Sequence, residues 1–187
     1  GDGAIRASRG NFGLVWVQGK GLDLTAYTGW ALRAIEPWAR LAEDLQQETG
    51  IDVGLKQTGG LYLCRTPEAL AQRAADLATV KARFSGEYDY EIMDNDRLRQ
   101  VVPQIGDGIA GGSYSRYDGQ ADPLRLLQAL YRAYLARGGG YLSGHGVTRI
   151  ERKAGKFHLT TAAGTVIANR IVLSSGLGNV ALGEMLG

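Results

Sequence analysis

Several features that would assign the chain to a class are scarce in its sequence or missing from it. A single cysteine, Cys64, stands among the 187 residues, so neither an intramolecular disulfide nor a cysteine-rich zinc site can form. The two histidines, His145 and His158, have no acidic or nucleophilic partner at a recognisable motif spacing. We therefore expect no metal site, interpret Cys64 as a packing residue, and place the protein in a reducing compartment, the cytoplasm.

Long apolar runs and an excess of one charge are also missing. No run of about 18 apolar residues occurs, and the opening GDGAIRASRG lacks the apolar core of a signal peptide, so we expect no transmembrane segment and no export. Lys and Arg number 21 against 19 Asp and Glu, a net charge of +2. Because nucleic-acid-binding surfaces are strongly basic, we expect no nucleic acid partner.

Proline is sparse, with four residues, whereas glycine is frequent, with 28. This composition excludes collagen-like and low-complexity disordered chains. Apolar residues make up 44% of the 187 positions, which suffices for a globule with a core of its own. The glycines are therefore expected in tight turns.

An apolar stripe at three- and four-residue steps predicts a long amphipathic helix over residues 23–48. Its apolar positions are Tyr27, Trp30, Ala34, Trp38, Leu41 and Leu45. Pro37 lies inside the stripe and predicts a kink, because it lacks the N–H of a helical hydrogen bond. Gly50 follows as a stop signal.

Further helices are predicted from their start signals. Thr66-Pro67 combines a capping hydroxyl with a proline at the first helical position and predicts a helix over 67–84. A short helix is expected over 95–102, with Asp94 among the candidate caps. Asp122-Pro123 opens another helix, ended by glycines from Gly138 on. Its apolar face comprises Leu124, Leu127, Tyr131, Tyr134 and Leu135.

Extended segments are predicted at 55–65, 88–93 and 106–117. From His145 onward, short extended segments alternate with turns and predict a β-meander. The meander leads into a buried strand over 170–175 and a candidate terminal helix over 179–186. Together these elements predict a mixed α/β (α+β) fold.

Two glycine-rich stretches could meet an anionic ligand. Gly176–Ala181 fits the pattern G-x-G-x-x-A, in which amides at a helix N-terminus bind a pyrophosphate. Alone, this pattern has two interpretations. One is a nicotinamide-dependent dehydrogenase, which would need a following strand with an acidic residue. The other is a plain strand-to-helix turn. The stretch from Arg6 to Gly13 interleaves hydroxyl, guanidinium and amide groups with glycines, and the alternative is a solvated terminus.

Three stretches carry a resemblance when they are considered together. They are GDGAIRASRGNFGLVWVQGKG, then YDGQADPLRLLQAL ending in RGGGYL, and finally GVTRIER through TVIANRIVLSSGLGNVAL. In order and spacing they resemble the D-amino-acid-oxidase-like family of FAD-dependent oxidoreductases. This family includes glycine oxidase, sarcosine oxidase and the flavin subunits of D-hydroxyproline and opine dehydrogenases.

The resemblance implies part of an FAD/NAD(P)-binding fold with an inserted substrate-domain lobe. Residues 1–49 would form an FAD-domain segment and the long helix, 50–117 the substrate-domain lobe, and 118–187 the FAD-domain helix, β-meander and cofactor-facing turn. The family's GxGxxG motif would precede Gly1, and its substrate-binding arginine would follow Gly187. The chain thus resembles an internal fragment, for which we expect weak or no FAD binding and assign no catalytic residue.

The resemblance also implies a function and a set of contacts. The parent protein would oxidise the carbon–nitrogen bond of a small amino acid or a secondary or opine-type amine, with FAD as cofactor and a further protein chain as a candidate partner. A stand-alone subunit-interaction or binding module without catalysis is the alternative. The implied cofactor-binding residues are Ser8, Arg9, Asn11, Gly13, Leu14, Val15, Val147, Ser175 and Gly176.

Overall fold

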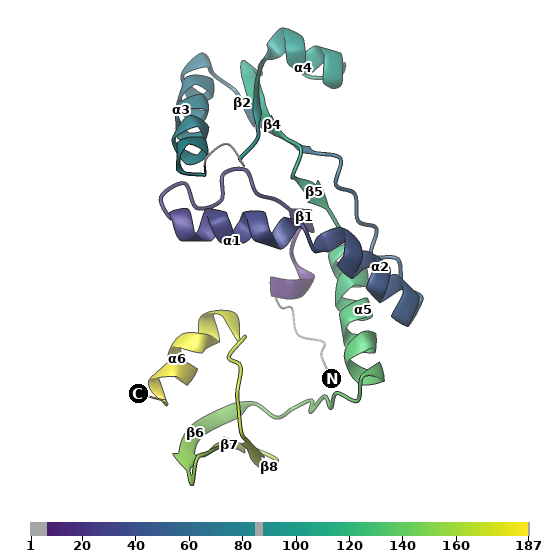
Figure 1. Cartoon of the computed structure of the whole chain (residues 1–187), viewed down its shortest axis with the longest axis vertical. Helices are drawn as coiled ribbons and strands as arrows, with labels where there is room; N and C mark the ends of the chain where they lie inside the picture. Colours follow the sequence, from purple (N-terminus) through teal and green to yellow (C-terminus); the bar gives the residue numbers. More distant parts are fainter. Residues whose placement is uncertain (1–6, 85–87, 187) are drawn as a thin grey trace. The chain divides into compact units, whose positions relative to one another are not determined.

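The computed structural model describes residues 7–84 and 88–186, and the chain divides into two compact units after Gly138 (Figure 1). Both units combine helices with antiparallel sheets, as the predicted mixed class requires. Among the described residues, no helix has the length and apolar character needed to cross a bilayer. The proposed assignment of residues 1–49, 50–117 and 118–187 to family domains stays a prediction.

Pro37 divides the predicted 23–48 helix into α1 (Thr25–Ile35) and α2 (Trp38–Thr49). The prediction of one kinked helix was wrong about continuity, because the missing N–H ends the hydrogen-bond ladder altogether. The stop at Gly50 is confirmed, since this residue adopts φ +72° and its N–H donates to the carbonyl of Gln46 at 2.8 Å. The apolar stripe predicted along residues 27–45 is also not buried as one face. Leu45 is buried, whereas Trp30 is 67% exposed.

The first unit contains a three-stranded antiparallel sheet with strand order β2-β4-β3. Its strands are β2 (Gly60–Cys64), β3 (Glu91–Asp94) and β4 (Gly111–Ser115). The connecting helices α3 (Pro67–Arg83) and α4 (Asn95–Val101) begin at the predicted caps. Thr66 Oγ1 accepts from the Ala69 amide at 3.2 Å, and Asp94 Oδ1 accepts from the Arg97 amide at 2.8 Å.

The core of this unit has two clusters. Val17, Leu77, Val80 and Tyr88 form a nearly solvent-free cluster where α3 meets the loop that follows β1 (Leu14–Val15). Leu45, Val53, Ala129 and Ala133 form the second, between α2 and α5 (Pro123–Ala136).

The buried face of α5 differs from the predicted one. Ala129 and Ala133 are buried, whereas the five residues predicted as the apolar face are 39–51% exposed. Small side chains let α2 and α5 lie side by side (Figure 1). The five leucines and tyrosines of the predicted face therefore lie outside the buried contact between α5 and α2.

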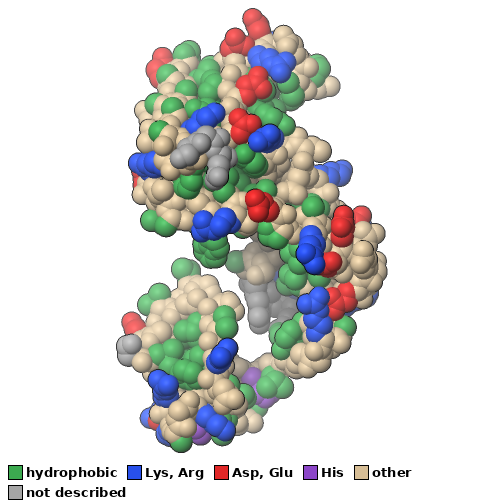
Figure 2. Space-filling view, in the orientation of Figure 1, with side chains coloured by type: hydrophobic (Ala, Val, Ile, Leu, Met, Phe, Trp, Pro, Cys, Tyr) green, Lys and Arg blue, Asp and Glu red, His purple; other side chains and the backbone are tan. Residues whose placement is uncertain are grey.

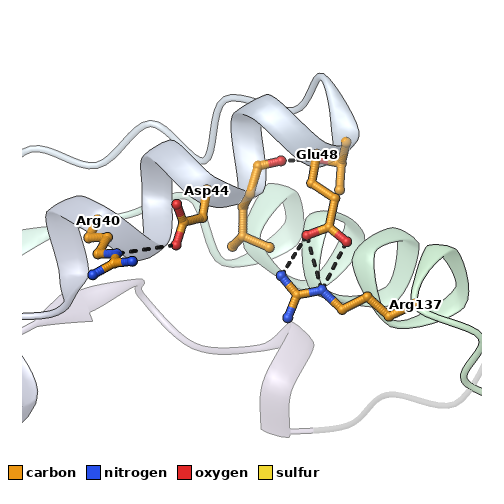
Figure 3. A network of polar contacts seen from close by, with 6 residues as sticks. Arg40, Asp44, Glu48 and Arg137 are labelled. Carbon is orange, nitrogen blue, oxygen red and sulfur yellow. Dashed lines mark hydrogen bonds and ion pairs between the residues drawn. The ribbon is translucent and has the colours of Figure 1, made fainter.

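An ion pair joins the C-terminal ends of α2 and α5 (Figure 3). Arg137 Nη2 donates to Glu48 Oε2 at 2.7 Å, and its Nε donates to both carboxylate oxygens at 2.9 and 3.2 Å. This fork geometry holds the pKa of the Glu48 carboxyl below its usual range. Within α2, Arg40 and Asp44 pair at 3.7 Å, one helical turn apart.

A second, two-stranded ribbon pairs β1 with β5 (Gly119–Gln120). A 3-10 turn, η1 (Ala7–Arg9), precedes β1. Gln120 also exchanges backbone hydrogen bonds with Lys56, at 2.8 and 2.9 Å. Segments that lie about 60 and 100 residues before β5 thus both pair with it. On the face shown in Figure 2, acidic and basic side chains of this unit are interspersed.

The second unit contains the predicted β-meander, which is confirmed. Its strands are β6 (Val147–Lys153), β7 (Lys156–Thr161) and β8 (Gly164–Ala168). The buried strand predicted over 170–175 is wrong: these residues form no strand, and Val172 is 88% exposed. A strand needs a neighbour to satisfy its backbone groups, and none of the strands in the described part of the chain pairs here.

The Leu77→Ala variant tests the first core cluster. Leu77 has 0% exposure, so truncation should lower the free energy of unfolding by about 2–5 kcal/mol through lost burial and a cavity. Leu135→Ala, on an exposed helical position, should change it by less than about 1 kcal/mol. Urea denaturation of both variants measures the difference, and equal losses would contradict this placement of the core.

Candidate functional site

A pocket of about 330 Å³ lies between η1, β1 and the first half of α5. Its lining brings together five of the nine residues predicted to contact a cofactor: Ser8, Asn11, Gly13, Leu14 and Val15. The other lining residues were not predicted to contact a cofactor: Trp38, Ala121, Pro123, Leu126, Leu127 and Leu130. Their local signals predicted helices and not a pocket, because they lie 30 or more residues from Ser8 along the chain. We call this hollow the β1 pocket.

The backbone around Gly13 can form only without a side chain. Gly13 has φ +71°, and a Cβ there would lie 1.9 Å from the carbonyl oxygen of Ala121. Its N–H donates to Asn11 Oδ1 at 2.8 Å, and its carbonyl accepts from the Ala121 amide at 2.8 Å. Asn11 Nδ2 in turn donates to the Ser8 carbonyl at 2.9 Å. These bonds hold the Ser8–Gly13 turn against the residues that lead into α5.

The lining of the β1 pocket is polar on one side and apolar on the other. Ser8 and Asn11 supply the polar side, and the leucines of α5 supply the apolar wall. This division suits a flat ring system with a polar edge. Ligand pockets usually measure about 300–1,000 Å³, so the β1 pocket could take one end of a dinucleotide such as FAD, but not the whole.

Arg9 lies in an adjoining, more polar hollow of about 670 Å³, which shares Asn11, Ala121 and Pro123 with the β1 pocket. Lys56 and Arg125 also line it. The carboxylate of Asp122 caps α5 there and accepts from the amides of residues 124 and 125 at 2.9 and 3.0 Å.

The remaining predicted residues, Val147, Ser175 and Gly176, lie in the second unit. Val147 opens β6, and Gly176 opens the 3-10 turn η2 (Gly176–Gly178) with φ +59°. The Ser175 amide donates to Asn179 Oδ1 at 2.7 Å. The six-residue helix α6 (Asn179–Glu184) follows η2, but no described strand leads directly into this turn. The strand-to-helix context of a dinucleotide fingerprint is therefore not formed by the described residues around Gly176–Ala181.

A buried carboxyl group, which the sequence did not indicate as a structural anchor, holds the loop after β1. Asp118 is fully buried, and its Oδ1 accepts from the amides of Val17 at 2.6 Å and Gln18 at 3.3 Å. Burial raises the pKa of the Asp118 carboxyl, and the hydrogen bond from Val17 partly opposes that rise. Because Asp118 lies about 100 positions from its partners, no local pattern indicated this role.

A buried arginine completes the attachment of this loop. Arg73 of α3 donates to Ser113 Oγ at 3.0 Å and to Gln18 Oε1 at 3.1 Å. Gln18 Oε1 also accepts from Ser113 Oγ at 2.6 Å, and Gln18 Nε2 donates to the Gly60 carbonyl at 2.9 Å. The loop is thus bonded to α3, β2 and β4, and this fixes the position of β1 at the pocket.

Comparison with known proteins shows the family of the chain. A family model described as FAD dependent oxidoreductase, DAO, matches residues 1–187. The chain belongs to this family. The resemblance stated from the three sequence stretches is therefore confirmed, and the family accounts for the mixed fold.

Individual members of the FAD dependent oxidoreductase family are similar over most of the chain. A subunit of opine oxidase from Agrobacterium tumefaciens (strain Ach5) is 37% identical over 190 residues, which cover 100% of this chain and 51% of that protein. Mitochondrial dimethylglycine dehydrogenase of Rattus norvegicus is 32% identical over 152 residues, 79% of this chain and 17% of that protein.

A solved structure shows the same fold. The crystal structure of glycine oxidase from Geobacillus kaustophilus matches with a TM-score of 0.84 and 27% identity, covering 97% of this chain and 48% of that one. The chain therefore spans about half the length of the opine oxidase subunit and of this glycine oxidase.

Substitutions at Asp118 test the buried anchor. Asp118→Asn keeps an acceptor for the Val17 amide and should fold with similar stability. Asp118→Leu leaves two buried amides unsatisfied and should cost about 1–3 kcal/mol for each. Urea denaturation at about pH 4, before the pH-dependent difference described next develops, measures both variants.

The same variants give a pH dependence of defined sign. The folded-state pKa of Asp118 is raised, so the wild type should lose stability relative to Asp118→Asn as pH rises from about 4 through that folded pKa. Stability curves measured from about pH 4 to about pH 8 provide the comparison. A wild type that instead gains on the asparagine variant with rising pH would contradict the raised pKa.

Proposed function

We propose that the protein carrying this chain is an FAD-dependent oxidoreductase that oxidises the carbon–nitrogen bond of an amino acid or a secondary, opine-type amine. Membership of the FAD dependent oxidoreductase family supports the cofactor. The names of the relatives support the substrate class, because opines, glycine and dimethylglycine are all small amines. In this proposal the chain supplies part of the cofactor site.

The observation that carries the proposal is the convergence of Ser8, Asn11, Gly13, Leu14 and Val15 on the β1 pocket. These residues come from the turn and strand that we expect to run beside the flavin. They line a preformed hollow with one polar side and one apolar wall. Part of FAD fits such a hollow better than a small hydrated anion does, because the flavin ring has apolar faces.

Each part of the pocket has a role in this proposal. FAD, when bound, supplies the acceptor for the hydride that leaves the carbon next to nitrogen. The leucines of α5 exclude water from the apolar side. Asn11 holds the turn through its two hydrogen bonds, and Gly13 lets the backbone approach closely because it has no side chain.

A partner chain and a compartment belong to the same proposal. The opine oxidase relative that matches all of this chain is named as one subunit of its enzyme, which supports a multi-subunit assembly. The single cysteine, Cys64, is buried, and a chain without disulfides is suited to the cytoplasm.

Reduction of bound flavin tests the proposed activity. The full-length protein that contains these residues, purified with its cofactor and kept free of oxygen, should lose flavin absorbance when an opine-type amine or N-alkyl amino acid is added. Hydroxy acids of matched size serve as controls and should leave the spectrum unchanged, because they lack the carbon–nitrogen bond. Bleaching by none of a panel of amines would overturn the proposal.

Gly13→Ala tests the cofactor contact separately. The added Cβ cannot coexist with the Ala121 carbonyl at 1.9 Å, so β1 must shift and the full-length protein should retain less flavin per chain. Gly106→Ala is the matched control, because a Cβ at Gly106 meets nothing within 4 Å. Flavin released by heat and measured by absorbance gives the stoichiometry, and full retention in Gly13→Ala would refute this contact.

A further inference from the structure

Gln18, in the loop after β1, is a buried polar residue whose backbone is bonded on both sides. The residue is 3% exposed. Its N–H donates to Asp118 Oδ1 at 3.3 Å, and its carbonyl accepts from Trp16 Nε1 at 2.9 Å. The backbone of Gln18 is therefore tied both to the buried carboxyl group and to the side chain next to β1.

The side-chain amide of Gln18 joins the loop to three other elements. Its Oε1 accepts from Arg73 Nη2 of α3 at 3.1 Å and from Ser113 Oγ of β4 at 2.6 Å. Its Nε2 donates to the carbonyl of Gly60, the first residue of β2, at 2.9 Å. Arg73 Nε also donates to Ser113 Oγ at 3.0 Å. Because the oxygen meets donors and the nitrogen meets an acceptor, the amide fits in only one of its two orientations.

A network of this kind gives position more than stability. Buried hydrogen bonds replace bonds to water and therefore contribute little net free energy, whereas a network in which every member is bonded rigidifies and specifies one arrangement. What it fixes here is β1, because Gln18 lies three positions after Val15, a residue that lines the β1 pocket. The ladder of β1 with β5 has only two residue pairs, so it cannot resist a shift of the loop.

Trp16 lies in the chain between Gln18 and the pocket wall. Its indole is bonded to the Gln18 carbonyl, and a Cβ on Gly60 would lie 2.8 Å from its ring atom Cζ3. The ring therefore packs against the backbone of β2, at the residue that also accepts from Gln18 Nε2. A displacement of Gln18 removes this fixed contact directly beside Val15.

We propose that Gln18 is a positioning residue of the flavin site: it transmits the position of α3, β2 and β4 to β1 and so holds Leu14 and Val15 in the wall that the flavin contacts. Gln18 is not among the residues that line the β1 pocket, so it acts through β1 and not by touching the cofactor. This inference rests on the proposed function, in which the β1 pocket takes part of FAD.

Gln18→Met in the full-length flavoprotein tests this role. Methionine has a similar length but no polar atoms for Arg73, Ser113 and the Gly60 carbonyl. A protein whose binding-competent form is less populated binds its ligand more weakly in the same proportion, and one buried hydrogen bond corresponds to about 10-fold. The Kd of the flavin-free protein for FAD, measured by quenching of flavin fluorescence, should therefore rise by about 10-fold or more. The visible absorption band of the bound flavin should shift, because the wall beside it moves.

Ser113→Ala is a milder variant that removes one hydroxyl from the network. It should raise the Kd for FAD in the same direction but by a smaller factor. Amide hydrogen exchange of the flavin-free protein gives a readout that does not involve the cofactor. Exchange at Val17 and Gln18 should be faster than in the wild type in Ser113→Ala, and faster still at these two positions in Gln18→Met.

Two control variants separate positioning from stability and from the substitution itself. Leu98→Ala truncates a fully buried side chain of α4 outside the network, and should destabilise the protein while changing the Kd for FAD by less than about twofold. Gln47→Met makes the same exchange at an exposed position of α2 and should behave as the wild type. A Kd in Gln18→Met that stays within about twofold of the wild type, or an equal rise in Leu98→Ala, overturns the inference.

The proposed function and this inference fail on different observations. A wild-type full-length protein that binds no FAD contradicts the proposed function, and the inference falls with it. If FAD binds but no amine reduces it, the proposed reaction fails, while the ratio of the Kd values still decides the role of Gln18. If amines reduce the flavin and the wild type and Gln18→Met have equal Kd values, the function stands and the positioning role is wrong.

Discussion

The arrangement of the first unit depends on one buried carboxylate. Asp118 accepts hydrogen bonds from two consecutive amides of the loop after β1. An unpaired buried amide is costly, so the loop cannot leave this position without losing both bonds. β1 is only two residues long, and its own ladder with β5 is too short to hold it. Asp118 and the neighbouring Arg73–Gln18–Ser113 contacts supply that attachment.

Because this attachment fixes β1, the strand borders two hollows. Leu14 and Val15 line both the β1 pocket and a second hollow of about 420 Å³, whose lining includes all three tryptophans. Gly13 brings the chain against the residues before α5, and Thr28 ties the far end of the loop to α1. A short strand held at both ends therefore forms a common wall of two hollows. Rigid elements of this kind hold reacting groups more accurately than free loops.

Local signals in the sequence predicted most of the secondary structure. Thr66-Pro67 and Asp122-Pro123 marked helix starts, because capping depends on a few adjacent residues. The failures have a different cause. The helix faces of α1 and α5 were misjudged because burial depends on which neighbour a helix meets, and α5 meets α2 through alanines. The expected strand over 170–175 failed because an apolar run becomes a strand only beside a pairing partner.

The sequence by itself determined the capped starts of α3, α4 and α5, the mixed α/β class, the family, and a set of candidate cofactor contacts near Ser8 and Gly13. Only the tertiary structure decided which of these contacts share a pocket, and that Leu126, Leu127 and Leu130 form its apolar wall. It also decided that Asp118 is an anchor and that the three tryptophans line one hollow. The physical reason is distance along the chain: caps act over a few residues, whereas pocket walls and buried hydrogen bonds join residues up to about 100 positions apart.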